Sequence, residues 1–286
     1  MTEAIPSTTT DRGARPRTVL ICHHDAPIDH DGLVRWLGTA TDLVGVVRIT
    51  EDPALLGRRA RREISRTGYL RFLDVVAFRL YYRLRLASAD ALWEKEELAR
   101  LAARYPKTPH VPVHDTSTPN SPETGAFLRS LSPDLVVARC KFLLKKEIFS
   151  IPPGGTLVLH PGICPEYRNA HGCFWALAND DTEKVGVTLL KVDAGVDTGP
   201  VLGYYSYPYD EIAESHIRIQ LRCVTENLDA LAEAFARIHA GTAPAIDTAG
   251  RPSAVWGQPW LTRYLLWKIR ARRRTLARGL QARSAP

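Results

Sequence analysis

The sequence predicts an α/β protein with a mostly parallel sheet, and three observations lead to this fold class. Thr18–Cys22 is a short apolar run, typical of a buried strand. A turn-rich segment and a helical pattern through Leu33–Leu37 then lead into a second apolar run, Leu43–Arg48. Strand, helix and strand within about 30 residues form a βαβ unit, whose strands lie parallel. Further apolar runs bounded by Gly and Pro follow after residue 130.

The other elements follow in order along the chain. Residues 55–103 show no strand pattern and predict a helical insertion. Within it, one amphipathic stripe comprises Leu73, Val76, Ala77, Leu80 and Leu84. Strands are expected at 134–138, 156–159, 185–192 and 201–207, and helices at 145–150, 172–179 and 214–239. No internal repeat interrupts this order, so the chain predicts one α/β domain.

The net charge is unevenly distributed. The chain has 38 Lys and Arg against 31 Asp and Glu, which gives +7. Nine basic and no acidic residues lie from residue 248 onward, and subtracting them leaves −2 for residues 1–247. We therefore expect a flexible N-terminus over residues 1–16, a domain over 17–247 and a basic tail over 248–286.

Composition excludes several classes of protein. A hydrophobic fraction of 45% with 24% charged residues is ordinary for a globular chain and argues against disorder. No run approaches 18 apolar residues, and the N-terminus lacks the apolar core of a secretory signal. The five cysteines are scattered, with no CxxC pair. They predict reduced thiols in a cytoplasmic protein and no metal site.

Three predicted strand or loop ends carry polar motifs. They are His23-His24-Asp25, His160-Pro161-Gly162 and the loop 193–200, Asp-Ala-Gly-Val-Asp-Thr-Gly-Pro. Open α/β sheets bind ligands beyond the carboxyl ends of their strands, so these motifs are candidate site residues. A histidine held at the end of a rigid strand suits a general base, and Asp197 could orient its ring.

Two of these motifs together resemble a known family. The stretch LVLHPGICPEYRNAHGCFWALANDD, followed by VGVTLLKVDAGVDTGPVL, resembles the folate-dependent formyltransferases. That family acts on methionyl-tRNA, phosphoribosylglycinamide and nucleotide sugars. Its hallmark is a strand ending in Asn-x-His-Pro-Ser, a Tyr-Arg-Gly-like loop, and a Gly-Val-Thr strand running into Asp-x-Gly-x-Asp-Thr-Gly. The match covers about 75 residues, 132–207. It implies a Rossmann-like formyltransferase domain with a helical insertion and a basic C-terminal helix.

The resemblance implies an activity and a set of site residues. The activity is transfer of a formyl group from 10-formyltetrahydrofolate to an amine acceptor, such as an amino sugar or another small phosphorylated metabolite. His160 matches the catalytic histidine and Asp197 the catalytic aspartate. The expected folate pocket is lined by Cys140, Lys141, Phe142, Leu143, Val192, Asp193, Ala194, Gly195 and Val196. The expected acceptor pocket is lined by His23, His24, Tyr167, Arg168, Asn169 and His171.

One departure from the family pattern bears directly on catalysis. Val158 stands where the family has the asparagine that donates to the formyl oxygen, and valine has no donor. Asn169 and His171 are the nearest candidates in sequence for a replacement donor. Two alternatives to the transferase therefore stay open. One is a non-catalytic folate- or acceptor-binding protein at a membrane surface, and the other is a 10-formyltetrahydrofolate hydrolase.

Two further features of the sequence narrow the range of acceptors that is expected. No glycine precedes Gly32 after the first strand, where phosphoribosylglycinamide enzymes carry a phosphate-cradling turn, so a purine precursor is disfavoured. Methionyl-tRNA enzymes append a C-terminal barrel, for which the 39 residues after 247 leave little room. A small-molecule amine is thus favoured over tRNA.

The basic segments suggest additional partners. Trp260, Tyr264 and Trp267 share one helical face in the tail. The tail is therefore expected to dock on the domain, to lie on an anionic membrane surface, or to bind nucleic acid. Nine Arg between Arg58 and Arg85 form either a solvated face or an anion-binding one. Peripheral attachment to the inner face of the membrane is one expectation, and the oligomeric state stays open.

Overall fold

The computed structural model describes residues 15–51, 57, 61, 63–65 and 68–284. Most of the predicted flexible N-terminus and the first part of the predicted helical insertion lie outside the described residues. Side chains are described as far as Ala277.

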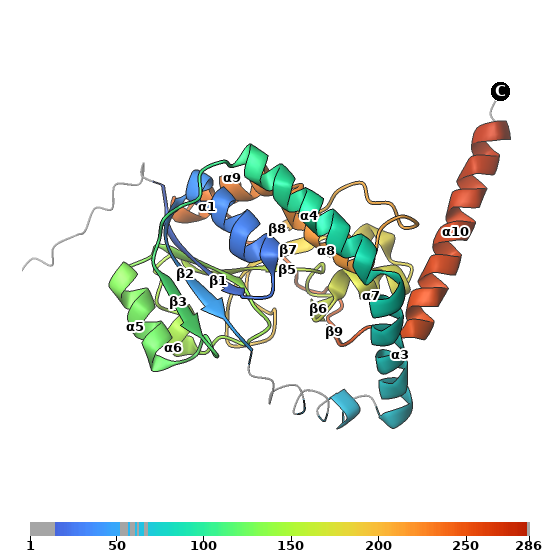
Figure 1. The fold of residues 1–286 in the computed structure, drawn as a ribbon, viewed down its shortest axis with the longest axis horizontal. Helices are drawn as coiled ribbons and strands as arrows, with labels where there is room; N and C mark the ends of the chain where they lie inside the picture. Colours follow the sequence, from blue (N-terminus) through green and yellow to red (C-terminus); the bar gives the residue numbers. More distant parts are fainter. Residues whose placement is uncertain (1–14, 52–56, 58–60, 62, 66–67, 285–286) are drawn as a thin grey trace, which may run out of the picture.

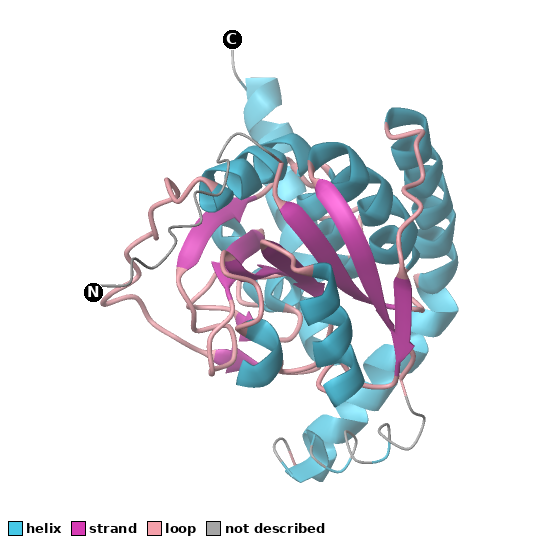
Figure 2. Cartoon of the chain, turned by 90° about the vertical axis from the view of Figure 1, so that its left-hand side faces the viewer, coloured by secondary structure: helices cyan, strands magenta, loops and turns pink. Residues whose placement is uncertain are grey.

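A seven-stranded sheet forms the centre of the fold, as Figure 2 shows. Its strands are β1 (Arg17–His23), β2 (Asp42–Ile49), β3 (Val113–Thr116), β4 (Leu135–Arg139), β5 (Gly155–His160), β7 (Val187–Lys191) and β8 (Val201–Tyr205). Their order is β3-β2-β1-β4-β5-β7-β8. The first five strands in that order run parallel, and β7 and β8 are antiparallel additions. The predicted α/β class with a mostly parallel sheet is confirmed.

Helices cover both faces of the sheet (Figure 1). They are η1 (Ile28–Leu33), α1 (Val34–Ala40), α3 (Tyr69–Arg85), α4 (Ala87–Arg104), α5 (Pro122–Leu131), α6 (Lys146–Phe149), α7 (Gly172–Ala178), η2 (Thr182–Lys184), α8 (His216–Thr225), α9 (Leu228–His239) and α10 (Leu261–Ser284). A separate two-stranded sheet pairs β6 (Arg168–Asn169) with β9 (Val255–Trp256).

Alternation along the strands builds two cores, one on each face of the sheet. On β1, Leu20 and Cys22 pack into the large core, which includes residues of α1, α4 and α7 to α10. Val19 and Ile21 point the other way, into a smaller core with α5 and α6. Successive side chains of a strand point to opposite faces, so a strand covered on both sides is apolar throughout. This is why the short apolar runs were recognisable as strands.

The predicted single helix over 214–239 is wrong. The segment forms two helices, α8 and α9, separated at Glu226 and Asn227. The Asn227 amide donates to the backbone carbonyls of Cys223, at 2.9 Å, and Ser206, at 3.0 Å. Asparagine side chains compete with helical backbone bonds in this way, which explains the break.

The structure also contains a strand and a helix that were not predicted. β3 is a four-residue edge strand, Val-His-Asp-Thr, with no buried residue and no apolar alternation. α5 carries a clearer signal, because Ser121 caps it by accepting from the Thr124 amide and Pro122 occupies its first turn.

The basic tail forms α10, which docks on the domain. Tyr264, Trp267 and Ala271 are buried in the large core. The Trp267 indole donates to Glu211 at 2.9 Å, and the Arg274 guanidinium pairs with the same carboxylate at 2.6 Å. Of the three interpretations of the tail, docking as a terminal helix is therefore confirmed.

The apolar stripe predicted for the helical insertion faces solvent and does not face the core. On α3, Leu73, Leu80 and Leu84 are exposed, as is Val76, whereas Val75 and Phe78 are buried. The aliphatic residues thus point to solvent, because the aromatic side of α3 contacts α10 through Phe78 and Tyr81 against Tyr264.

Candidate functional site

The candidate site lies at the carboxyl edge of β1, β4 and β5. The strand order reverses between β1 and β4, which is where open α/β sheets leave a ligand crevice. His23, at the end of β1, spans this point because its Nε2 accepts from the Lys141 backbone amide at 3.0 Å. Alternation places His23, Cys140, Val158 and His160 on the same face of the sheet.

His23 is buried and neutral in character. Burial lowers its pKa, and the charge of Lys141 adds to that effect. Its Nδ1 lies 3.5 Å from Glu51 Oε1. A histidine that accepts a backbone hydrogen bond through Nε2 carries its proton on Nδ1, the nitrogen that faces Glu51. The predicted acceptor residue His23 is therefore a buried bridge between β1 and β4 at the edge of the site.

Arg139 fixes the same edge and was not predicted. Its guanidinium pairs with Asp29 at 3.0 Å and donates to the Leu159 carbonyl at 2.7 Å. This links the end of β4 to η1 and to β5, one residue before His160. A lone arginine at a strand end gives no signal in a single sequence.

His160 and Asp197 lie in contact, in agreement with what the family resemblance implies. His160 Nδ1 lies 3.3 Å from Asp197 Oδ2, and the histidine is 3% exposed. The loop that carries Asp197 begins at the opposite end of β5, because β7 is antiparallel to it, and folds back along the strand. Asp197 Oδ2 also accepts from the Asn169 backbone amide at 2.8 Å.

The second ring nitrogen of His160 is engaged as well. Nε2 lies 2.7 Å from the Tyr167 carbonyl oxygen, so it donates there. A neutral imidazole has one N–H, whereas two oxygen acceptors face this ring. A doubly protonated ring satisfies both, and a neutral one leaves the Nδ1 lone pair facing the carboxylate. The Nε2–H of His160 becomes available to another acceptor only when the Tyr167 carbonyl moves aside.

The loop 193–199 is held rigidly by its own contacts. Asp193 Oδ1 accepts from the Gly195 amide at 2.9 Å and from the Thr198 hydroxyl at 2.8 Å. A Cβ at Gly199 would lie 1.8 Å from the Lys191 carbonyl oxygen, so only glycine fits there. The loop thus presents Asp197 in a defined place.

Three residues expected to line the acceptor pocket have hydrogen-bond partners within the protein. Tyr167 is buried and donates to Asp181 Oδ2 at 3.0 Å. Arg168 donates to the Val196 carbonyl at 3.0 Å, which ties it to the Asp197 loop. The Asn169 amide donates to the Trp256 carbonyl. Asn169, one of the two candidates to replace the family asparagine as donor to the formyl oxygen, therefore already donates to a backbone carbonyl.

Residues 251–257 of the tail, which we call the C-terminal strap, bind to the segment that carries Tyr167, Arg168 and Asn169. Arg251 pairs with Glu166 at 2.7 Å, and the Trp256 indole donates to the Glu166 carbonyl at 2.8 Å. The Trp175 indole donates to the Gly257 carbonyl at 2.9 Å. The strap also supplies β9, the partner of β6. Sequence reasoning missed this role, although Trp256 was a visible signal.

The two other predicted acceptor histidines lie in different surroundings. His24 is exposed and stacks against His30, with ring centroids 6.1 Å apart. His171 has a left-handed backbone, with φ of 55°, and its Nδ1 is buried without a hydrogen-bond partner among the described residues. Its ring lies 5.8 Å from that of His216. Burial lowers the pKa of His171 to about 4, and the charges of Lys141 and Arg79 contribute.

The low pKa of His171 predicts acid-sensitive stability. The unfolded chain binds a proton at His171 near pH 6.5, whereas the folded chain does so only near pH 4. The neutral ring therefore makes its full contribution to the unfolding free energy above pH 6.5, and this contribution is lost as the pH falls from 6.5 towards 4. Between pH 7.5 and pH 5, wild type should lose about 2 kcal/mol more unfolding free energy than His171→Asn. Asparagine tolerates the left-handed backbone. Urea unfolding at both pH values measures this, and equal losses would contradict the assignment.

The residues expected to line the folate pocket fall into two places. Leu143 and Val196 are exposed although apolar, and they lie in the loops after β4 and β7, the two neighbours of β5. Phe142 stacks on His23, with centroids 6.1 Å apart. Lys141 and Ala194 are exposed, whereas Cys140, Asp193 and Gly195 are half-buried.

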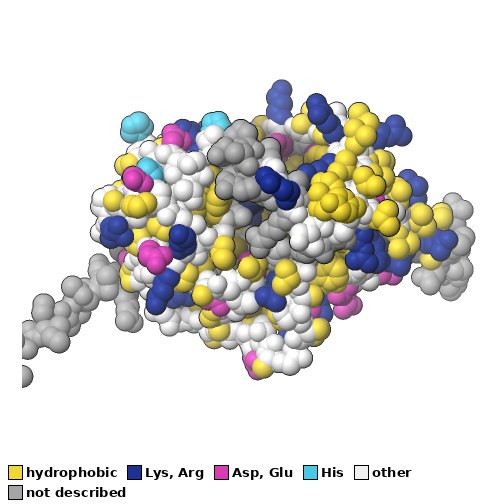
Figure 3. All heavy atoms as spheres, turned by 90° about the horizontal axis from the view of Figure 1, so that it is seen from below, with side chains coloured by type: hydrophobic (Ala, Val, Ile, Leu, Met, Phe, Trp, Pro, Cys, Tyr) yellow, Lys and Arg dark blue, Asp and Glu magenta, His cyan; other side chains and the backbone are white. Residues whose placement is uncertain are grey.

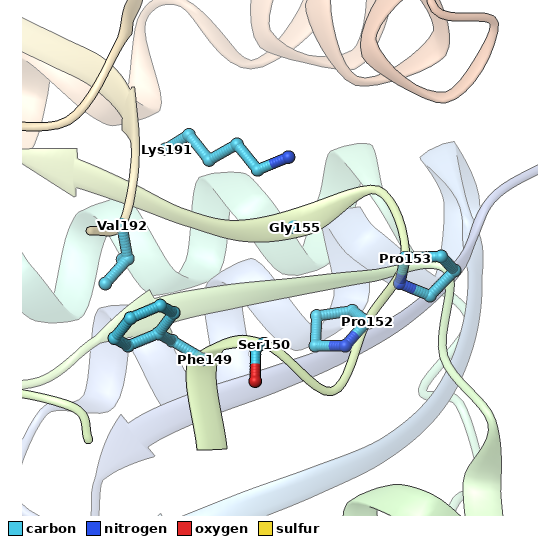
Figure 4. Close-up of a pocket in the computed structure, with 7 residues that line it drawn as sticks. All are labelled: Phe149, Ser150, Pro152, Pro153, Gly155, Lys191 and Val192. Carbon is cyan, nitrogen blue, oxygen red and sulfur yellow. The ribbon is translucent and has the colours of Figure 1, made fainter. Parts of the chain in front are cut away.

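Val192 lies apart from the others. It lines a shallow depression of about 270 Å³ at the amino end of β5, with Phe149, Ser150, Pro152, Pro153, Gly155 and Lys191 (Figure 4). Lys191 reaches across Gly155 there, where a Cβ would meet its side chain. Because His160 is at the other end of β5, this depression and the histidine are separate features.

A metal site would need several His, Cys, Asp or Glu side chains close together. Within the described residues, no three or more His, Cys, Asp or Glu side chains form a group that could hold a metal ion. Asp29, one of several aspartates and histidines within residues 23–31, is paired with Arg139.

Comparison with known proteins relates this site to a family. The formyl transferase family profile matches residues 94–234. The chain is 37% identical over 128 residues to a methionyl-tRNA formyltransferase of Geobacter metallireducens, a region covering 42% of this chain and 41% of that protein. It is 39% identical over 93 residues to the Trichlorobacter lovleyi enzyme, covering 32% and 29%. The similarity therefore spans about two fifths or less of these relatives.

Solved structures share the fold over a longer stretch. A sugar N-formyltransferase from Shewanella sp. superposes with a TM-score of 0.52, covering 89% of this chain and 87% of that one at 14% identity. A glycinamide ribonucleotide transformylase from Symbiobacterium toebii gives 0.50, covering 87% and 96% at 14% identity. These likenesses confirm the Rossmann-like formyltransferase fold. The chain is thus similar to the formyl transferase family over residues 94–234 and shares the fold of solved formyltransferases.

Proposed function

We propose that this protein transfers a formyl group from 10-formyltetrahydrofolate to an amine on a small acceptor. The single observation that carries the proposal is the contact between His160 and Asp197 at the end of β5, on the family motifs. Exposed apolar residues in the loops on either side of β5, Leu143 and Val196, fit a flat pterin ring and support binding of the folate.

The side chains of the site have distinct roles in this reaction. The acceptor nitrogen forms a bond to the formyl carbon, and the bond from that carbon to the folate nitrogen breaks. Once the Tyr167 carbonyl moves aside, the Nε2–H of His160 stabilises the negative charge on the formyl oxygen, and the ring relays the acceptor's proton to the departing nitrogen. Asp197 holds the ring in place and balances its positive charge.

The absence of the family asparagine makes two other functions worth testing. Val158 is half-buried among Leu190, Cys164 and Tyr204 and supplies no donor. A site with one donor fewer could bind the folate without turnover or pass the formyl group to water.

The charge near the site includes exposed Lys141, which favours an acceptor bearing phosphate or carboxylate.

Folate release distinguishes these functions. The full chain is incubated with 10-formyltetrahydrofolate and a library of amine metabolites, and tetrahydrofolate is followed spectroscopically. We expect release that depends on an amine. Release without amine would indicate a hydrolase, and saturable binding without release would indicate a binding protein, and either result would reject the transferase.

A further inference from the structure

The outward face of α3 carries an unusual row of large aliphatic side chains. Leu70, Leu73, Leu80 and Leu84, which we call the leucine stripe, are between 57% and 85% exposed. They recur at helical spacing on the side opposite Val75 and Phe78, which are buried. The stripe extends over 15 residues, from Leu70 to Leu84, or about 21 Å of helix.

Basic residues border this stripe. Arg79, Arg83 and Arg85 are exposed on the same helix, whereas Arg71 lies on the opposite side, over the Trp260 ring. The helix's single acidic residue, Asp74, accepts hydrogen bonds from Thr262 of α10 and is therefore engaged. The leucine stripe is thus apolar at its centre and positive at its margins.

The neighbouring helix α10 also exposes aliphatic and basic side chains. Leu265, Ile269 and Leu276 are exposed along it, together with Arg272 and Arg273. α3 and α10 lie at the same end of the molecule (Figure 1). On the face seen in Figure 3, hydrophobic side chains gather at this end, with Lys and Arg side chains at their border.

We propose that α3 docks the protein on an anionic lipid bilayer surface. The leucine stripe would enter the boundary between headgroups and acyl chains, and the arginines would contact acidic headgroups. An apolar helical face bordered by Arg is the pattern of helices that lie in this interface. Among the described residues, no helix combines the length and apolar character needed to cross a bilayer, so the contact is peripheral.

Charge favours lipid over the other occupants. In a symmetric dimer through this face, Arg79, Arg83 and Arg85 of one copy would lie near those of the other, which is repulsive. A nucleic acid would pair with the arginines but leave four leucines in water. An anionic bilayer satisfies both the charged and the apolar residues.

Vesicle binding of the full chain tests this proposal. Phosphatidylcholine vesicles are compared with vesicles containing phosphatidylglycerol, by cosedimentation at low and high salt. We expect binding to the anionic vesicles only, weakened by salt. The double variant Leu73→Glu/Leu80→Glu should bind about tenfold or more weakly. Leu92→Glu, at an exposed leucine of α4, is the matched control and should bind as wild type does.

The arginines are tested separately. Arg83→Gln/Arg85→Gln should weaken binding to anionic vesicles roughly tenfold, and Arg129→Gln on α5 should leave it unchanged. Equal binding by the leucine variants and their control would overturn the proposal. So would a solution dimer, seen by light scattering, that Leu73→Glu dissociates. Neither readout requires formyl transfer, so failure here and failure of the proposed activity are distinguishable.

Discussion

His160→Ala is expected to reduce formyl transfer by about 10³-fold or more. The variant removes both the N–H that would reach the formyl oxygen once the Tyr167 carbonyl moves aside and the group that moves the proton, and each such role is worth roughly 10²-fold or more. The effect should fall on kcat, because the ring acts on the reacting atoms. Single-turnover measurement of tetrahydrofolate release reports it directly.

Folding must be separated from chemistry in this experiment, because His160 also donates to the Tyr167 carbonyl. His110→Ala, at an exposed histidine far from the motifs in sequence, is the matched control and should retain the wild-type rate. His160→Gln keeps a donor toward Tyr167 and should keep the thermal midpoint while losing the rate. The double variant His160→Ala/Asp197→Ala should lose little more than His160→Ala, because the two residues act as one unit. Additive losses would contradict the pairing.

Val158→Asn is expected to raise the transfer rate by about 10²-fold or more. Val158 and His160 are two residues apart on β5 and point to the same face, so an amide at 158 lies beside the imidazole. One donor to a developing oxyanion is worth about 10²–10³ in rate. The substitution should cost roughly 1–3 kcal/mol of stability, because the position packs against Leu190 and Cys164.

The matched control for this gain is Val158→Asp. Aspartate has the shape of asparagine, but an ionised carboxylate donates no hydrogen bond, so it should bring no increase. A rate unchanged in Val158→Asn would mean that another group already stabilises the formyl oxygen. His171 would then be the next residue to examine, since its Nδ1 has no partner among the described residues.

The sequence was sufficient to predict the sheet, and the resemblance to the formyltransferases was sufficient to expect that His160 and Asp197 lie together. Apolar runs such as Thr18–Cys22 are recognisable because both faces of the sheet are covered. His160 and Asp197 were predictable because their motifs have distinctive composition and spacing. The closeness of these two residues, 3.3 Å apart in space, follows from the β7–β8 loop folding back along β5.

Other features depend on contacts between distant segments, which one sequence does not reveal. Tyr167, Arg168 and Asn169 are expected from the sequence to line an acceptor pocket, and the structure adds that their side chains donate to Asp181, Val196 and Trp256. The leucine stripe has the periodicity of a buried face, and only the packing of α3 on α10 shows that it points outward. The break after α8 depends on one asparagine amide.

Tracing the formyl carbon tests the central claim most directly. The full chain is incubated with 10-formyltetrahydrofolate labelled at the formyl carbon and with the amine that supports folate release. The account predicts label in the N-formylated amine with wild type, more of it with Val158→Asn, and none with His160→Ala. Label recovered as formate, or retained on the folate with every variant, would contradict formyl transfer by His160 and Asp197.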